Sequence, residues 1–241
     1  NRFRMKNLIL RFPFYASISD LYNVYDFASM SIIRIPSSVP YDSNIFLVTG
    51  ERPILVDTGS GLDSAAIISR IRSFSNVDPV AVVLTHCHYD HIGGLKDMIQ
   101  AFGCTAYSGI RDSPYIRSGD SEHTLSTMFG SSLSPLDVSD APEGFNFDTG
   151  DSVLRVIETP GHTEGSICLY DDSNGSLISG DTLFMNGFGR VDFPGGSMDS
   201  MRSSLSKLSN IDIRGLFPGH GNACERYIPD YLAGVLRMAG V

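Results

Sequence analysis

The chain has 241 residues, of which 42% are hydrophobic and 19% charged, a composition typical of one globular domain over residues 1–241. Its formal net charge is −9 without a basic cluster beyond the extreme N-terminus, so we do not expect it to bind nucleic acid. No apolar run is long enough for a membrane-spanning helix, so we expect no membrane association. The four cysteines are far apart and form no Cys-x-x-Cys pair, which predicts free thiols and a cytoplasmic location.

The first half of the chain shows alternating strand and helix patterns. Short β-branched and aromatic runs predict strands, and apolar residues at helical spacing predict helices. An unbroken apolar run at 80–84 is typical of a strand that is buried on both faces. The expected strands are 8–10, a hairpin of 45–48 and 54–56, and 80–84; the expected helices begin after Asp63 as N-cap and end near Phe74, and run from Leu95 to a C-cap at Gly103.

The second half begins with a polar stretch, 109–148, that is rich in Ser, Gly, Asp and Pro. A long irregular stretch of this kind is either a lid over a site or a surface insertion, and we keep both interpretations. A weak helical pattern occurs within it at 124–129. The expected strands that follow are 153–157, 166–170 and 177–179, and the expected helices are about 199–209 and about 226–238.

The histidines carry the main chemical signal. Three of the six in the chain, His86, His88 and His91, lie together with Asp90 directly after the buried run at 80–84. Loops at the carboxyl ends of strands are where α/β sheets place ligands. His162 and His220 each follow a Pro-Gly pair after a strand-like run, and Asp181 ends another run. Glycine before a ligand allows the sharp turn that presents the imidazole, whereas His123 stands alone and is not expected to be a ligand.

These seven side chains predict a metal centre. Divalent zinc or iron binds imidazole nitrogen and carboxylate oxygen, and a catalytic site keeps one position open. Five histidines and two aspartates exceed what one ion needs. We therefore expect two divalent ions that share a carboxylate, zinc in the first place and iron or manganese as alternatives.

The pattern His86-x-His88-x-Asp90-His91, with Asp57-Thr58-Gly59, Gly161-His162, Gly180-Asp181 and Gly219-His220 in the same order, resembles the metallo-β-lactamase fold family. The resemblance implies an αββα sandwich of two mixed sheets with outer helices. It implies that one metal is bound by His86, His88 and His162 and the other by Asp90, His91 and His220, with Asp181 bridging. It also implies that Asp57 orients a ligand; the alternative is a polar residue that closes the hairpin.

The segment from Gly187 to Gly196 is similar to the glyoxalase II and persulfide dioxygenase branch of that family. In this branch a cationic side chain at the position of Arg190 binds a carboxylate of a thiol substrate, for which arginine is well suited. The alternative for Arg190 is a salt bridge to Asp192. Lactamases with a cysteine ligand have Cys where Asp181 stands, so antibiotic hydrolysis is not expected. The stretch after His220 is short for the helical domain with which glyoxalase II binds glutathione.

The resemblance implies a hydrolase in which a metal-bridging hydroxide, oriented by Asp90, attacks a thioester or a related ester. One alternative is a persulfide dioxygenase with one iron on His86, His162 and Asp181. Another is a lactonase, with Leu183–Met185 and Phe188 either lining an acyl pocket or packing in the core. A metal-binding regulatory module is the non-enzymatic alternative. The oligomeric state stays open, a homodimer included.

Overall fold

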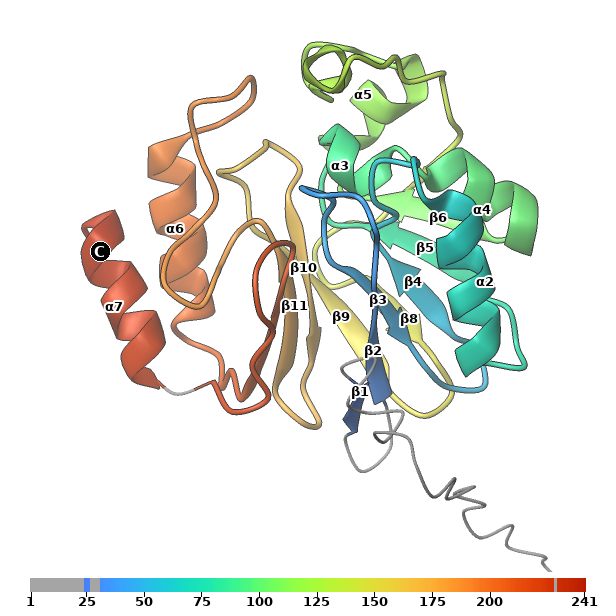
Figure 1. Ribbon diagram of the computed structural model, residues 1–241. Helices are drawn as coiled ribbons and strands as arrows, with labels where there is room; N and C mark the ends of the chain where they lie inside the picture. Colours follow the sequence, from blue (N-terminus) through green and yellow to red (C-terminus); the bar gives the residue numbers. More distant parts are fainter. Residues whose placement is uncertain (1–23, 27–30, 228) are drawn as a thin grey trace, which may run out of the picture.

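The computed structural model describes residues 24–26, 31–227 and 229–241, and the strand expected at 8–10 lies outside them. Two β-sheets lie face to face (Figure 1). The first sheet contains, in spatial order, β1 (Val24–Asp26), β2 (Ser31–Ile35), β3 (Ile45–Val48), β4 (Ile54–Val56), β5 (Ala81–Leu84), β6 (Thr105–Ser108) and β7 (Ser139–Asp140). The second contains β12 (Gly215–Pro218), β11 (Ser176–Gly180), β10 (Ile167–Asp171), β9 (Val153–Glu158) and β8 (Asn146–Asp148).

Both sheets are mixed. In the first sheet β1 to β4 pair antiparallel, whereas β4, β5, β6 and β7 pair parallel. In the second sheet β11 and β12 are parallel and the other neighbours are antiparallel. The parallel pair of β4 and β5 is joined by the helix α2 (Ser64–Phe74), which confirms the strand-helix-strand unit expected there.

Alternation along each strand explains why the apolar runs are unbroken. Phe46 on β3 and Val83 on β5 face the second sheet and pack in one cluster with its Leu169. Their neighbours Leu47 and Leu84 face the other way and pack with the helices. Each strand of the core therefore serves two apolar layers.

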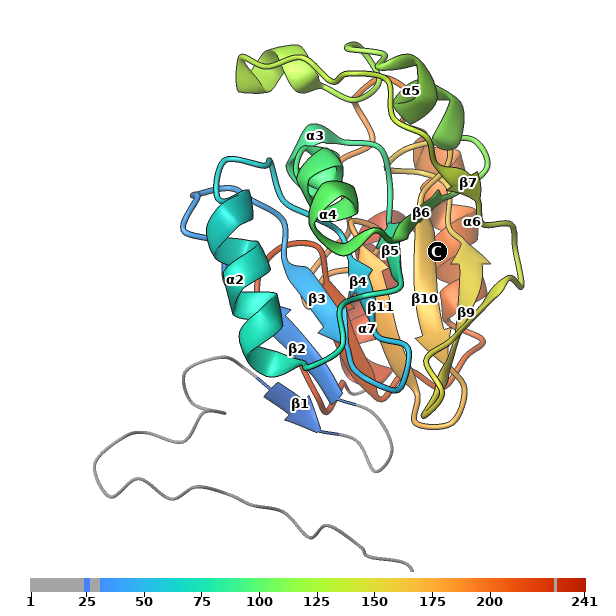
Figure 2. The same ribbon diagram turned by 90° about the vertical axis from the view of Figure 1, so that its right-hand side faces the viewer.

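The helices form the outer layers. On the first sheet these are α2 and α4 (Leu95–Phe102), which Figure 2 shows side by side. On the second sheet they are α6 (Met198–Leu208) and α7 (Pro229–Ala239). Buried Ile67 and Met98 belong to the cluster of the first sheet, and Met201 and Val235 belong to that of the second. The expected four-layer αββα sandwich is confirmed.

Most expected elements are present within one or two residues at their ends, with some corrections. Gly103 ends α4 with φ 64°, as expected for a left-handed C-cap. Asp63 stands at the N-cap of α2, but its side chain does not cap the helix. Its carboxylate instead accepts hydrogen bonds from the backbone N–H of Ser38 at 2.9 Å and from Arg70 Nη1 at 2.9 Å.

The stretch 109–148 is less irregular than its composition predicts. It contains α5 (Ser113–Ser118), the 3₁₀ helix η1 (Ser126–Phe129) and the edge strands β7 and β8. The weak helical pattern at 124–129 corresponds to η1. The strands β2 and β6 were not among the expected elements. The strand β6 has the sequence Thr-Ala-Tyr-Ser and forms because it pairs with β5 on one side and β7 on the other.

Two further expectations concern the chain as a whole. Among the described residues no helix is long and apolar enough to span a membrane. Cys87, Cys104, Cys168 and Cys224 are free, as expected.

The interface between the sheets should depend on Phe46, whose ring meets that of Phe217 edge to face at 5.8 Å. We expect Phe46→Ala to lower the free energy of unfolding by about 3–5 kcal/mol, because it leaves a cavity between two rigid layers. Val153→Ala, at a side chain that is 46% exposed on β9, is the control and should cost less than about 1 kcal/mol. Equal effects in urea unfolding would contradict this account of the core.

Candidate metal centre

Seven predicted ligands lie together where strands of both sheets end. His86 and His88 follow β5, and Asp90 and His91 lie one turn later on the short helix α3 (Tyr89–Ile92). The predicted strand-to-helix loop therefore becomes helical within the motif itself. The remaining three come from the second sheet: His162 follows β9, Asp181 follows β11 and His220 follows β12.

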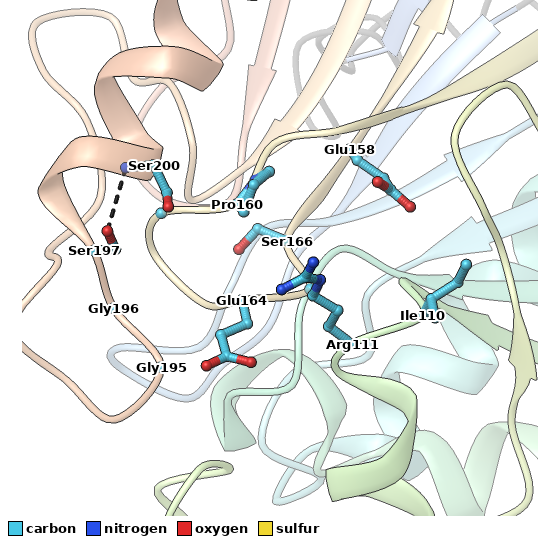
Figure 3. A pocket seen from close by; sticks show the side chains of 12 residues that line it. Ile110, Arg111, Glu158, Pro160, Glu164, Ser166, Gly195, Gly196, Ser197 and Ser200 are labelled. Carbon is cyan, nitrogen blue, oxygen red and sulfur yellow. Dashed lines mark hydrogen bonds between the residues drawn. The ribbon is translucent and has the colours of Figure 1, made fainter.

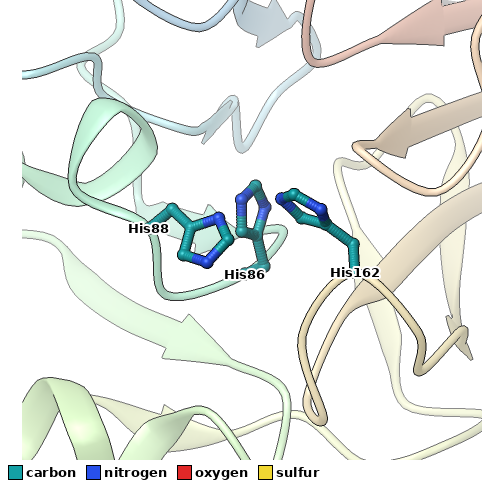
Figure 4. Close-up of side chains that lie close together, drawn as sticks. All are labelled: His86, His88 and His162. Atoms are coloured by element: carbon teal, nitrogen blue, oxygen red, sulfur yellow. The ribbon is translucent and has the colours of Figure 1, made fainter. Parts of the chain in front are cut away.

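Three imidazoles converge from two loops, as Figure 4 shows for His86, His88 and His162. Their ring centroids lie 4.5–4.7 Å apart. All three Nε2 atoms are buried, and none has a hydrogen-bond partner in the part of the chain that the structure describes. A buried polar atom without a partner costs about 1–3 kcal/mol, so such a set fits a cation that accepts all three lone pairs.

A second group comprises Asp90, His91 and His220. His220 Nε2 lies 3.1 Å from Asp90 Oδ2, and His91 Nε2 lies 3.2 Å from His220 Nε2. Asp181 lies between the two groups: its carboxylate oxygens are 3.6 Å from His162 Nε2, 3.6 Å from His220 Nε2 and 3.5 Å from His91 Nε2. Candidate ligand atoms within each of the two groups lie within 4.8 Å of one another.

Hydrogen bonds to the outer ring nitrogens direct the inner ones toward the centre. His91 Nδ1 lies 2.8 Å from Asp57 Oδ2, and His162 Nδ1 lies 2.6 Å from the carbonyl oxygen of Arg190. His86 Nδ1 lies 3.1 Å from Thr85 Oγ1. Asp57 also accepts hydrogen bonds from the backbone N–H and the hydroxyl of Thr85, both at 2.8 Å. The predicted contact of Asp57 with a ligand histidine is present.

Burial and neighbouring charges set the protonation of these groups. Burial lowers the pKa of His86 well below its usual value, and the neighbouring imidazoles lower it further. Burial also lowers the pKa of His88 and His162. Burial acts in the same direction on His91, but the carboxylates of Asp57, Asp90 and Asp181 outweigh it and raise the pKa to about 10.

Asp90 stays ionised. Burial acts to raise the pKa of its carboxyl group, but His91 and His220 outweigh it and lower the pKa to about 2. A cation bound by Asp90, His91 and His220 would require the neutral form of the His91 imidazole, so metal binding would release a proton wherever that imidazole is protonated.

The two Pro-Gly-His turns need glycine, each for its own reason. Gly161 has φ 150°, and an added Cβ would lie 2.6 Å from the Cα of Met201 on α6. An added Cβ on Gly219 would lie 2.7 Å from His91 Cε1 and closer still to Asp181 Oδ1. The expectation that glycine allows a sharp turn before the ligand applies to Gly161, whose φ is positive. For Gly219 the reason is lack of space beside two candidate ligands.

Two positioning residues have no motif that marks them in the sequence. Asn44 Nδ2 donates to the carbonyl oxygens of Pro218 and Gly221 at 2.8 and 2.9 Å, which fixes the loop of His220. Asp112, fully buried before α5, lies between the two loops that carry the unpartnered imidazoles. It resembles any aspartate before a helix, and only the tertiary structure shows its partners.

Asp112 accepts three hydrogen bonds from these loops. The backbone N–H of Cys87 donates at 2.8 Å, the hydroxyl of Thr163 at 2.7 Å and the backbone N–H of Gly165 at 2.8 Å. Burial raises the pKa of its carboxyl group, and the three donors act in the opposite direction. One carboxylate thus joins the His86–His88 loop of the first sheet to the His162 loop of the second.

Arg190 forms the salt bridge to Asp192 that was expected as the alternative to substrate binding. Its guanidinium group donates to both carboxylate oxygens of Asp192, at 2.9 and 2.7 Å, and lies 4.2 Å from the ring centroid of Phe193. Its carbonyl oxygen is the partner of His162 Nδ1. Substrate binding by its side chain stays a prediction. His123 is part of no ligand group; its ring stacks on Tyr115 at 3.9 Å.

The candidate ligands open into a hollow of about 350 Å³, which is lined by five of them and by apolar side chains. A separate hollow of about 490 Å³ lies beside the first turn of α6 (Figure 3). Figure 3 shows Arg111 extending toward the loop of Glu164 and Ser166. None of the seven candidate ligands lines that hollow, so we place the chemistry in the first.

Asp57→Asn tests the orienting contact. An amide can keep the bond from the Thr85 N–H, and asparagine tolerates the φ of 60° at this position. Its NH₂ group, however, would face His91 Nδ1 and favour the wrong tautomer for a ligand. We expect metal affinity, measured by competition with a chromophoric chelator, to fall by about 10–100-fold. Asp140→Asn on the surface is the control, and native affinity in the Asp57 variant would refute the assignment.

Asp112→Asn tests the link between the loops. The amide replaces one of the two acceptor oxygens with an NH₂ donor, which would face at least one group that now donates, so we expect a loss of about 1–3 kcal/mol in the free energy of unfolding. Because both ligand loops would shift, chelator competition should also show weaker metal binding. Asp151→Asn, at an exposed residue, is the matched control. A variant with lower stability and unchanged metal affinity would reduce Asp112 to a purely structural residue.

Known proteins similar to this chain identify its family. The family model of the metallo-β-lactamase superfamily matches residues 39–220. A probable metallo-hydrolase of Methanocaldococcus jannaschii is 32% identical, with 79% of this chain and 93% of that protein covered. The atrochrysone carboxyl ACP thioesterase of Aspergillus fumigatus is 27% identical, with 86% of this chain and 44% of that protein covered.

Solved structures of similar proteins have a similar fold. A protein in a di-iron-bound form is 29% identical with a TM-score of 0.68, covering 78% of this chain and 92% of that one. The B3 metallo-β-lactamase BLEG-1 is 25% identical with a TM-score of 0.67, covering 80% of this chain and 93% of that one. Together with the two mixed sheets and the seven clustered side chains, the family match leads to one conclusion: the chain belongs to the metallo-β-lactamase superfamily.

Proposed function

We propose that the protein is a hydrolase that holds two divalent cations and cleaves a thioester or a related ester. The observation that carries the proposal is the position of Asp181. Its carboxylate lies 3.6 Å from His162 Nε2 in one group of imidazoles, and 3.5 and 3.6 Å from His91 and His220 in the other. A carboxylate between two sets of three ligands suits a bridged pair of ions.

In this proposal two sets of three side chains would each hold one cation, and Asp181 would be a ligand of both. His86, His88 and His162 would hold one cation; Asp90, His91 and His220 would hold the other. All are nitrogen or carboxylate ligands, which suits zinc first and iron or manganese as alternatives. The similar protein that was solved with two irons supports a pair of ions at such a site.

The bound ions would supply water that ionises near neutral pH and would polarise the carbonyl group of the substrate. Asp90 is ionised at neutral pH and faces the hollow, so it can accept a hydrogen bond from the attacking water and orient it. Asp57, Thr85 and the Arg190 carbonyl hold the imidazole rings in place. A thioester and a lactone both present a carbonyl carbon to this arrangement.

A second candidate uses part of the same site. His86, His162 and Asp181 form a set of two imidazoles and one carboxylate, which is the pattern of oxygen-activating iron. A persulfide dioxygenase with one iron would use these three and leave Asp90, His91 and His220 without a metal. Metal stoichiometry separates the two candidates.

The test is metal analysis of anaerobically purified protein, followed by assays with a thioester, a lactone and glutathione persulfide. We expect two equivalents of metal and ester hydrolysis that a chelator abolishes. His86→Ala and Asp181→Ala should each deplete metal and lower hydrolysis by more than about 100-fold, since each removes a direct ligand.

His123→Ala serves as the control because it removes a histidine outside the ligand groups; its metal content and activity should equal those of the native chain. One equivalent of iron with oxygen uptake on the persulfide would establish the dioxygenase instead. Full hydrolysis by the Asp181 variant would refute the bridging role.

A further inference from the structure

The hollow beside the candidate ligands has one polar end and walls that are mostly apolar, with Arg190 among the lining residues. Its polar end is formed by five candidate ligands: His88, Asp90, His162, Asp181 and His220. Six apolar side chains form the walls: Leu125, Met128, Phe129, Phe184, Phe188 and Phe193. A volume of about 350 Å³ is within the range of small-molecule sites.

Half of these apolar walls come from the segment around η1, within the stretch 109–148. This segment is tied to the helix that carries Asp90 and His91: the backbone N–H of Tyr89 donates to the Thr124 carbonyl at 2.8 Å, and the Tyr89 and Ser131 hydroxyls lie 2.7 Å apart. In both ribbon views the chain after α5 passes above α3 (Figures 1 and 2). The wall is therefore anchored to the metal-binding motif itself.

The backbone of this wall is held in a costly conformation. Leu125 has φ 56°, a region that costs a bulky residue of order 1–3 kcal/mol. The turn there leads the chain into η1, where Met128 is 66% exposed and Phe129 is 43% exposed. Large apolar side chains exposed at the rim of a hollow are typical of a ligand-binding surface.

The cationic side chain of the lining, that of Arg190, is already paired. Asp192 neutralises its guanidinium group through two hydrogen bonds and Phe193 lies against it. A carboxylate-bearing group would have to compete with Asp192 for Arg190.

A second hollow of about 660 Å³ shares Phe184, Phe188 and His220 with the first. Its lining is more mixed and includes Asn186 and Asn222. The two hollows therefore adjoin at these two aromatic side chains and at one candidate ligand, His220. An ester whose carbonyl lies at the ligands can extend one arm into each space.

We propose that the hollow walled by η1 binds the acyl group of the substrate, and that the substrate class is esters or thioesters of uncharged, apolar acids. This inference rests on the proposed hydrolase function. The more polar arm, which carries the leaving alcohol or thiol, then lies in the second hollow beside Asn186 and Asn222. The stretch 109–148 contributes to substrate selection through Leu125, Met128 and Phe129.

The test uses acyl thioesters of one thiol, with unbranched acyl groups from acetyl to decanoyl, on metal-loaded protein. We expect kcat/KM to rise by up to about fourfold per added methylene until the hollow is filled. The double variant Met128→Ser/Phe129→Ser should lower the decanoyl-to-acetyl ratio of kcat/KM by at least about tenfold while metal content stays native. Met238→Ser, at an exposed methionine on α7, should leave the ratio unchanged.

Hydrolysis that does not depend on acyl length, or that depends on the length of the thiol instead, would overturn the inference and leave the hydrolase proposal standing. The same holds if succinyl thioesters react faster than butyryl thioesters. Failure to hydrolyse any ester in a fully metallated sample would refute the hydrolase proposal itself, and the inference with it.

Discussion

Three buried imidazole nitrogens without hydrogen-bond partners are the constraint on which this structure depends. His86, His88 and His162 reach one point from two different sheets, and burial keeps them neutral. Among the described residues none forms a hydrogen bond with these nitrogens, so a cation bound at that point would offset their loss of contact with water. Stability and metal binding are therefore linked here, because a ligand that binds only the folded chain stabilises it.

The remaining architecture serves to hold these nitrogens. The two sheets pack through a continuous apolar layer, which fixes the end of β5 opposite the ends of β9, β11 and β12. Asp112 then joins two of the ligand loops across the sheets, and Asn44 fixes the loop of His220. The rigidity of the sandwich supplies the precision that loops alone would lack.

Much of the fold and most of the site follow from the sequence, for identifiable reasons. Strands that are buried on both faces leave unbroken apolar runs, so β3, β4 and β5 are visible in the sequence. The ligand histidines could be predicted because histidine is a common metal ligand and glycine before it allows the sharp turn that presents the imidazole. By contrast, β6 depends on its neighbours, and the Asp63 side chain binds Ser38 and Arg70 instead of capping its helix.

Other parts of the site depend on partners that are remote in the sequence. Asp112 meets residues more than 50 positions away, and only the fold brings them together. The apolar wall around η1 could not be predicted from the sequence, because it consists of three side chains within a stretch that is polar in composition.

X-ray absorption spectroscopy of the metal-loaded protein tests the central claim most directly. The account predicts nitrogen and oxygen ligands at about 2.0–2.2 Å and a second metal at about 3.5–4 Å. It also predicts that the thiol of Cys87, which is buried within the motif, contributes no sulfur ligand. A spectrum without metal–metal scattering, or one with a sulfur ligand, would contradict a bridged pair of ions on these seven side chains.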